Sequence, residues 1–292
     1  MKKHGGAEMN SNILYDYFSE IIGQGEKVIF LPAAGFSGKE GLNIADYLKG
    51  DFETHMLDLP GLGKGIGLQG RITSIRMANW LREYLDQKNI DKASFIGHSM
   101  GGGVLLAFAT HYPDRIKKLV LLDQGHKPMP RIPKSEFGVF AYSFPVLNVM
   151  ALLIGHPFLK LLRPLFKESN SENVDFNERV EQFCDAANID ESMYVRKAIK
   201  EEVGVTMDGL NLMFGYYNLN LPKMLKRIKV PTYLAYATFK NVSDLEYNNT
   251  CRYIKKLQRY DRPLITYRPV ESGYYVHWSD LSLLEDLKKY LK

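Results

Sequence analysis

The sequence has very little cysteine. Only two of its 292 residues are cysteines, Cys184 and Cys251, and they lie far apart along the chain. Such a pair builds no disulfide framework and fits no metal-binding spacing. No cluster of His, Cys, Asp and Glu has metal-ligand spacing either. We therefore expect no metal site, and we predict a reducing compartment and a cytoplasmic location.

A dense run of positive charge is also missing. Lys and Arg number 38 and Asp and Glu number 33, so the net charge is +5. A charge this small, spread along the chain, argues against nucleic acid as a partner. Hydrophobic residues make up 45% of the sequence and charged residues 24%, which is typical of a globular protein with a buried core. We expect a small-molecule substrate, and the sequence leaves the oligomeric state open.

Long uncharged segments are rare. The first residues, MKKHGGAEMN, contain two lysines with no apolar segment behind them, so we expect no signal peptide. Residues 137–159 contain no Asp, Glu, Lys or Arg, and this length can in principle span a bilayer. Because Pro145, Asn148 and Pro157 interrupt the segment, we predict no integral membrane span. We interpret it as the apolar inner face of a helical region, and contact with lipid stays an open alternative.

Short apolar runs alternate with helical stretches from Val28 onward. This alternation predicts an α/β fold with a doubly wound, mostly parallel sheet and helices on both faces. The expected strands are Val28–Leu31, Met56–Leu59, Ala93–Ile96, Leu119–Leu122, Pro231–Ala235 and Leu264–Arg268. The expected core helices are Thr73–Leu85, Gly101–Tyr112, residues 245–258 and residues 280–291.

The alternation stops between the fourth and fifth expected strands. Residues 127–228 have a helical pattern and no convincing strand. We therefore predict a core of residues 1–126 and 229–292, with residues 127–228 inserted into it as a helical cap.

The most informative segment is Gly97-His98-Ser99-Met100-Gly101, which matches the motif G-x-S-x-G. It lies between an expected strand and an expected helix, where this motif forms a sharp turn that exposes the serine hydroxyl at the carboxyl edge of the sheet. The flanking glycines avoid collisions with the neighbouring backbone. We predict that Ser99 is a nucleophile and that the Met100 N–H, at the helix N-terminus, stabilises an oxyanion.

Other segments occur around this motif in a familiar order. The LPAAG loop follows the first expected strand, DLPGLG follows the second, HYPDR follows the helix after Ser99, and VPT precedes a late strand. Together with GHSMGG, they make the sequence from about Gly25 to the C-terminus resemble the α/β-hydrolase fold family. The resemblance implies serine hydrolase chemistry on esters, amides and related bonds. It also implies that Asp58, the first residue of DLPGLG, belongs to a structural turn.

The same resemblance implies a second oxyanion donor. In the family, this backbone N–H belongs to the residue that follows a His-Gly pair. Here Pro32-Ala33 stands in place of that pair, which assigns the donor to Ala34. A backbone N–H requires no particular side chain, so donation is retained.

The general base is ambiguous. The base follows the serine and the acid in chain order in this fold, and only His277 lies beyond the last expected strand. We therefore predict that His277 accepts the Ser99 proton. In the family, however, the base commonly follows a glycine directly, and here Gly273 is followed by Tyr274. If Gly273 marks that place, a phenol with an ordinary pKa near 10 occupies it, which is a poor base at neutral pH.

The acid that would orient the base has two candidates. Asp123 follows the strand Leu119–Leu122, and some family members place their acid there. Asp244 follows the next strand at a greater distance, and Ser243 with Glu246 fits a capping box that would place Asp244 in the first turn of a helix. We favour Asp123 and keep Asp244 as the alternative.

These features predict a cofactor-independent, carboxylesterase-like serine hydrolase with a small or medium apolar substrate, because the expected cap is rich in apolar residues. The alternative is a hydrolase-like binding or sensing protein that keeps Ser99 but lacks a working base, which Tyr274 and Lys240 at the usual base and acid positions motivate. The G-x-G-x-x-G match at residues 65–70 does not directly follow a strand, so we expect no dinucleotide cofactor.

Overall fold

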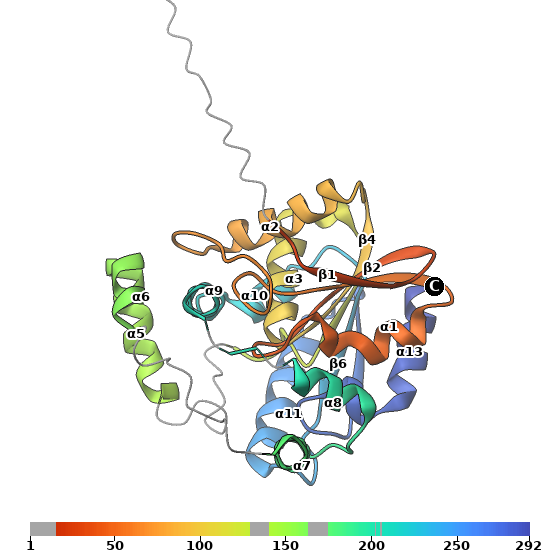
Figure 1. Ribbon diagram of the computed structural model, residues 1–292. Coiled ribbons are helices and arrows are strands. Elements are labelled where there is room, and N and C mark those ends of the chain that lie inside the picture. Colours follow the sequence, from red (N-terminus) through yellow and green to blue (C-terminus); the bar gives the residue numbers. More distant parts are fainter. Residues whose placement is uncertain (1–15, 129–139, 163–174, 202, 205) are drawn as a thin grey trace, which may run out of the picture.

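The computed structural model describes residues 16–128, 140–162, 175–201, 203–204 and 206–292. Its centre is a seven-stranded sheet in the order β1-β3-β2-β4-β5-β6-β7 (Figure 1). β1 pairs antiparallel with β3, and all other neighbours are parallel. The strands are β1 (Ser19–Gly23), β2 (Glu26–Leu31), β3 (Phe52–Leu57), β4 (Ala93–His98), β5 (Ile116–Leu122), β6 (Thr232–Ala237) and β7 (Ile265–Val270). The predicted fold class is confirmed.

Helices cover both faces of this sheet, as the sequence predicts. Those that pack on the sheet or close its edge are α1 (Leu42–Leu48), α2 (Ser74–Gln87), α3 (Ser99–His111), α11 (Asp244–Gln258), α12 (Val276–Ser279) and α13 (Leu281–Leu291). Two short 3₁₀ helices, η1 (Gly38–Gly41) and η2 (Pro113–Arg115), lie in the connections. Thr73 caps α2, because its hydroxyl accepts a hydrogen bond from Arg76 N at 3.4 Å.

The buried strand β2 shows how the core is divided. Its residues alternate in direction, so Ile29 and Leu31 join the apolar cluster under α2 and α3. Val28 and Phe30 join the second cluster, under α1 and α13. Because both faces are covered, β2 and β4 are apolar over most of their length and lack the polar alternation of a half-exposed sheet.

The described residues between β5 and β6 form helices and no strand. These helices are α5 (Phe140–Ile154), α6 (His156–Leu162), α7 (Phe176–Ala187), α8 (Met193–Lys200), α9 (Met207–Tyr217) and α10 (Leu221–Lys226). α9 packs on α3, where a Cβ at Gly103 would lie 2.3 Å from the Tyr216 ring. α5 packs on α9 through Phe144, whose ring stacks on Phe214 at 4.8 Å. The division into a core and a cap at residues 127–228 stays a prediction.

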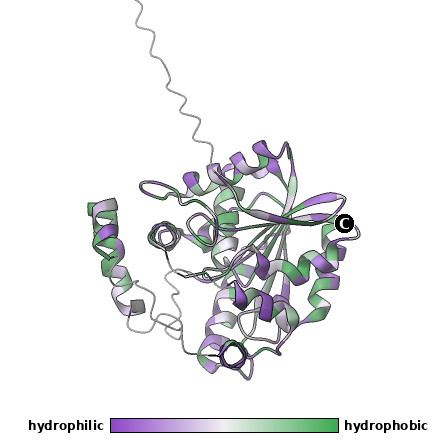
Figure 2. Ribbon diagram, viewed as in Figure 1, coloured by the Kyte–Doolittle hydropathy of each residue, from purple (hydrophilic) through white to green (hydrophobic). Residues whose placement is uncertain are grey.

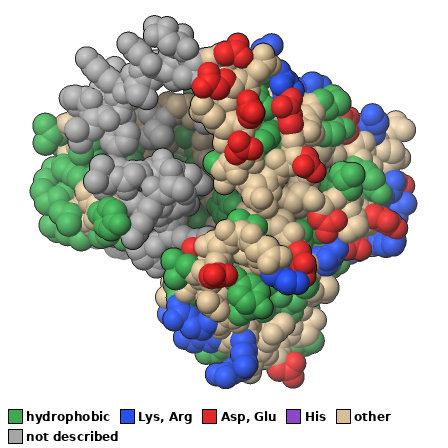
Figure 3. Space-filling view, turned by 90° about the horizontal axis from the view of Figure 1, so that it is seen from below, with side chains coloured by type: hydrophobic (Ala, Val, Ile, Leu, Met, Phe, Trp, Pro, Cys, Tyr) green, Lys and Arg blue, Asp and Glu red, His purple; other side chains and the backbone are tan. Residues whose placement is uncertain are grey.

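α5 and α6 stand at the side of the molecule (Figure 1). Their residues are largely apolar (Figure 2), and apolar side chains gather on the same side in the space-filling view (Figure 3). The inner face of α5 carries Phe144 and Asn148, and Asn148 pairs with Asn218 through hydrogen bonds of 2.9 and 3.1 Å. Within the described ranges, no helix has the length and apolar character needed to cross a bilayer.

Candidate active site

The turn at residues 97–101, which we call the elbow, joins β4 to α3. Ser99 has a φ of +48°, a strained conformation for a residue with a side chain. Neighbouring backbone explains the glycines around it. A Cβ at Gly97 would lie 2.7 Å from Gly102 N, and one at Gly101 would lie 2.3 Å from Leu31 O. The fold therefore places Ser99 at the carboxyl edge of the sheet, as the motif predicts.

A phenol meets the hydroxyl of Ser99. Tyr274 lies in residues 271–275, which connect β7 to α12 and which we call the Tyr274 loop. Its Oη donates a hydrogen bond to Ser99 Oγ. Tyr274 directly follows Gly273, so the contact with Ser99 comes from the residue that the sequence offers as the alternative to His277.

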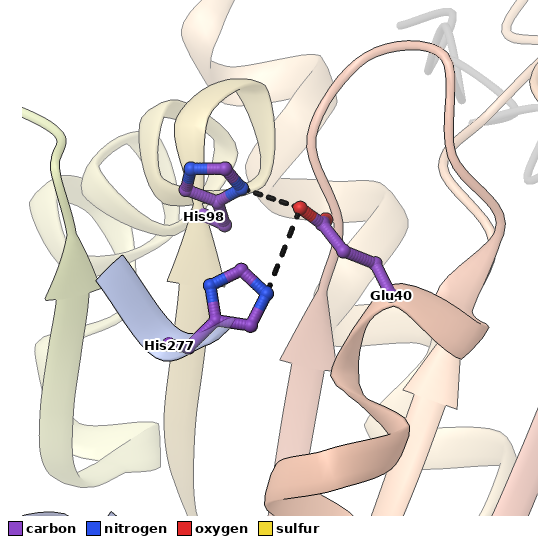
Figure 4. A group of neighbouring side chains, drawn as sticks. All are labelled: Glu40, His98 and His277. Carbon is purple, nitrogen blue, oxygen red and sulfur yellow. Dashed lines mark hydrogen bonds and ion pairs between the residues drawn. The ribbon is translucent and has the colours of Figure 1, made fainter. Parts of the chain in front are cut away.

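His277 faces a different group. His277 is the second residue of α12, and its side chain is fully buried. Its Nε2 lies 3.9 Å from Glu40 Oε1 (Figure 4). Among the described residues, no hydrogen bond joins the His277 ring to Ser99. Burial and the neighbouring His98 hold the pKa of His277 well below 6.5, which keeps it neutral. The structure therefore does not bring His277 to the serine, and its role as base stays a prediction without this contact.

Glu40 and His98 form a buried pair beside His277. The Glu40 side chain enters from η1, and its Oε1 lies 2.5 Å from His98 Nδ1 (Figure 4). Its other oxygen, Oε2, accepts the Ala33 N–H at 2.6 Å. On the far side of the His98 ring, Nε2 lies 3.2 Å from the carbonyl oxygen of Tyr274. Neither Glu40 nor His98 stands in a sequence pattern that predicts this pair.

The chain is similar to known hydrolases in sequence and in structure. A family model described as alpha/beta hydrolase fold matches residues 28–146, which include the elbow. The chain has the α/β-hydrolase fold. Solved structures of this fold agree over nearly the whole chain. The thermophilic esterase from Thermogutta terrifontis has a TM-score of 0.64 and 18% identity, with 95% of this chain and 93% of that chain covered. E-2-(Acetamidomethylene)succinate hydrolase has a TM-score of 0.67 and 14% identity, with 94% and 95% covered.

Sequence relatives match over a shorter stretch. A 2-hydroxy-6-oxo-6-phenylhexa-2,4-dienoate hydrolase from Burkholderia cepacia is 33% identical over 119 residues, which are 37% of this chain and 42% of that protein. A 2-hydroxy-6-oxononadienedioate/2-hydroxy-6-oxononatrienedioate hydrolase from Comamonas testosteroni is 33% identical over 108 residues, 35% of this chain and 38% of that protein. The matched stretch thus spans less than half the length of these relatives.

The oxyanion-hole candidates of the hydrolase fold lie on two adjoining segments. Residues 32–34, which we call the oxyanion loop, directly follow β2, and the Pro32 carbonyl accepts the Gly101 N–H at 2.9 Å. This bond holds the loop against the start of α3, where Met100 follows Ser99. The assignment of the Ala34 and Met100 amides as oxyanion donors is consistent with this attachment and stays a prediction.

The two acid candidates differ in their surroundings. Asp123 is buried at the carboxyl end of β5 and has a φ of +45°. Its Oδ1 accepts a hydrogen bond from the Ala237 N–H at 3.0 Å and lies 3.7 Å from His126 Nε2. Asp244 is exposed in the first turn of α11, where Ser243 is the N-cap, so the predicted cap is confirmed. Asp123 is therefore the candidate that the fold places inside the core, although its catalytic role stays a prediction.

Asp58 has the structural role that the sequence suggests. Its carboxylate accepts the Gly38 N–H at 2.7 Å and the Lys64 N–H at 2.8 Å. Burial raises the pKa of Asp58, and these two backbone bonds oppose that rise. The residue joins the turn after β3 to η1, and it thereby supports the helix that carries Glu40.

Glu40, His98 and His277 also raise the question of a metal ion. In the part of the chain that the structure describes, the possible ligand atoms of these three residues lie within 4.8 Å of one another, which is close enough to consider a shared ion. Two ligand atoms of one tetrahedral zinc ion, bound at about 2.0–2.1 Å, lie roughly 3.3 Å apart. The 2.5 Å contact between Glu40 and His98 is instead a hydrogen-bond distance, and Glu40 Oε2 is already bonded to Ala33. The geometry fits a hydrogen-bonded pair better than a metal centre.

Proposed function

We propose that this chain is a cofactor-independent serine hydrolase for small or medium apolar esters, and that it is slow at neutral pH. The observation that carries this proposal is the contact between Tyr274 and Ser99. A strained, glycine-flanked serine at the turn between β4 and α3 supports a nucleophile, and the phenol bonded to it supports Tyr274 as the group that takes the place of the base.

The proposed reaction uses residues of the three segments at the site. Ser99 Oγ attacks the ester carbonyl carbon while its proton passes to the Tyr274 oxygen in the phenolate form. The Ala34 and Met100 amides bind the resulting oxyanion. The tetrahedral intermediate then collapses, and the alcohol leaves with the proton that Tyr274 returns. Water cleaves the acyl-enzyme by the same proton path and regenerates Ser99.

A tyrosine as the general base explains why we expect a low rate of hydrolysis at neutral pH. A tyrosine of ordinary pKa, about 10, is ionised in roughly one molecule in a thousand at pH 7. General-base catalysis is most efficient when the pKa of the base lies near the working pH. We therefore expect hydrolysis that rises with pH well into the alkaline range.

The ester class rests on two supports. The relatives and structural neighbours named above include a thermophilic esterase and a 2-hydroxy-6-oxo-6-phenylhexa-2,4-dienoate hydrolase. The helices between β5 and β6 supply aromatic and aliphatic side chains, such as Phe144 and Phe214, next to the core. Ligand sites in proteins are mostly lined by apolar side chains, so an apolar insertion favours an apolar acyl or alkyl group.

Ligand binding without turnover is the second candidate function. Tyr274 donates its hydrogen bond to Ser99, whereas a working base must accept a proton from the serine. If the Tyr274 hydroxyl keeps its proton at every accessible pH, it cannot accept the proton of Ser99. The protein would then bind an ester-like ligand and release it unchanged.

Labelling with a fluorophosphonate probe, followed by intact mass, tests the proposal. We expect slow modification of the parent at Ser99, no modification of Ser99→Ala, and a lower rate for Tyr274→Phe. His277→Ala, if folded, should retain labelling because His277 does not contact the serine. Complete absence of labelling in the folded parent at pH 9, combined with ester-induced thermal stabilisation, would favour the binding function instead.

A further inference from the structure

We propose that Glu40 and His98 form a buried ion pair that holds the oxyanion loop, the elbow and the Tyr274 loop in register. They are positioning residues, because neither touches the reacting atoms. The catalytic consequence of this inference rests on the proposed hydrolase function, whereas the ion pair itself does not.

The partners of His98 require its charged form. Nδ1 faces the Glu40 carboxylate at 2.5 Å, and Nε2 faces the Tyr274 carbonyl oxygen at 3.2 Å. With Glu40 ionised, both partners are hydrogen-bond acceptors. A neutral imidazole has one N–H and can satisfy only one of them, whereas an imidazolium donates to both. The two contacts together therefore indicate a doubly protonated ring.

The charges around His98 support this state. Burial lowers the pKa of His98, but the charge and hydrogen bond of Glu40, with contributions from Asp123 and the Tyr274 carbonyl, raise it above the ordinary value. Three other ionisable side chains pack against the ring: Tyr274, Tyr275 and His277, at centroid distances of 4.8, 5.3 and 5.1 Å. His277 stays neutral, so it adds no second positive charge.

Each bond of the pair lies at or beside a residue with a proposed role. Ala33, which donates to Glu40 Oε2, immediately precedes the oxyanion donor Ala34. His98 immediately precedes Ser99. The third bond reaches the backbone of Tyr274 itself, whose side chain contacts Ser99. One carboxylate and one imidazolium thus connect three chain segments that are distant in sequence, and a shift in either would move the serine relative to its partners.

Complete burial makes this connection rigid and specific. The side chains of Glu40 and His98 have no exposed surface, so water cannot replace a lost partner. Charge-assisted hydrogen bonds are also shorter and stronger than neutral ones. A second anchor holds the same end of α12, because the Asn43 amide donates to the His277 carbonyl at 2.7 Å.

The ion pair can be tested without any substrate by NMR of the full chain labelled with ¹⁵N-histidine. We expect His98 to show two ring N–H protons that persist well above pH 7. In Glu40→Gln, His98 should lose one of them near neutral pH. The matched control is Glu53→Gln, since Glu53 Oε1 contacts a different histidine, His55, at 2.8 Å and should leave the His98 signals unchanged. A His98 ring that carries one proton at pH 7 and titrates near pH 6.5 would overturn the proposal.

The positioning role is tested by fluorophosphonate labelling of Ser99 in the same variants. We expect Glu40→Gln to label roughly 10- to 100-fold more slowly than the parent, because small displacements of reacting groups have effects of this size. Glu53→Gln should label at the parent rate. Equal rates for folded Glu40→Gln and the parent would overturn positioning. If Glu40→Gln does not fold, His98→Gln replaces it, and the titration of parent His98 still decides the ion pair. Failure of the parent to label contradicts the hydrolase function alone.

Discussion

Replacing Tyr274 with histidine should accelerate the reaction at neutral pH. The parent presents a phenol to Ser99, and a phenol of ordinary pKa is ionised in roughly one molecule in a thousand at pH 7. An imidazole of pKa about 6.5 is mostly neutral there, so the fraction in the base form rises by roughly 700-fold. The ring at this position packs against His98 at a centroid distance of 4.8 Å, so the imidazole would have the same neighbour as the phenol.

Two effects reduce that gain. An imidazole is a weaker base than a phenolate, and it reaches less far from the same backbone position. We therefore expect Tyr274→His to hydrolyse p-nitrophenyl acetate roughly 10- to 100-fold faster than the parent at pH 7. Its rate should level off above pH 7, while the parent rate continues to rise.

The assay needs controls for folding and for background hydrolysis. Tyr274→Phe keeps the aromatic ring without the hydroxyl and should be slower than the parent at pH 9. The double variant Ser99→Ala with Tyr274→His should show only the background rate. A folded Tyr274→His protein that is no faster than the parent at pH 7 would refute the reasoning, because the phenol would then not be the limitation.

Other predictions concern the fold around the site. Gly101→Ala should lower the free energy of unfolding by about 2–3 kcal/mol or prevent folding, because its Cβ would lie 2.3 Å from Leu31 O. Urea unfolding measures this change, and Gly50→Ala is the control because a Cβ there meets no atom within 4 Å. Thr73→Ala should cost about 1 kcal/mol in the same assay through loss of the cap on α2. His277 has a folded pKa below 6.5, so its neutral form contributes stability above that pH that is lost as the pH falls. The loss of stability between pH 7 and pH 5 should accordingly be smaller in folded His277→Gln, and an unchanged loss would contradict the neutral assignment.

The sheet could be predicted from sequence because its signal is local. Each predicted strand overlaps an observed one, since buried parallel strands are continuous apolar runs. The strand predicted at Met56–Leu59 is displaced from β3, Phe52–Leu57, because the polar residues Glu53 and Thr54 interrupt its apolar pattern. β1 was missed because it is a short antiparallel edge strand with only partly buried residues.

The site was harder to predict because it depends on contacts between distant segments. The motif identified the elbow, since the glycine and serine spacing itself encodes the turn. The choice between Tyr274 and His277 depended on the backbone after β7, which the sequence pattern does not define. Glu40 lies in a polar connection between a strand and a helix, and nothing in its local sequence indicates that it is fully buried.

The central claim is that Ser99 is a reactive nucleophile whose proton acceptor is the Tyr274 phenol. The most direct test is the rate of fluorophosphonate labelling of the parent from pH 6 to pH 10.5. We predict a single modification, confined to Ser99, whose rate rises continuously toward pH 10. A rate that levels off near pH 7, as an imidazole base would produce, or labelling that persists in Ser99→Ala would contradict it.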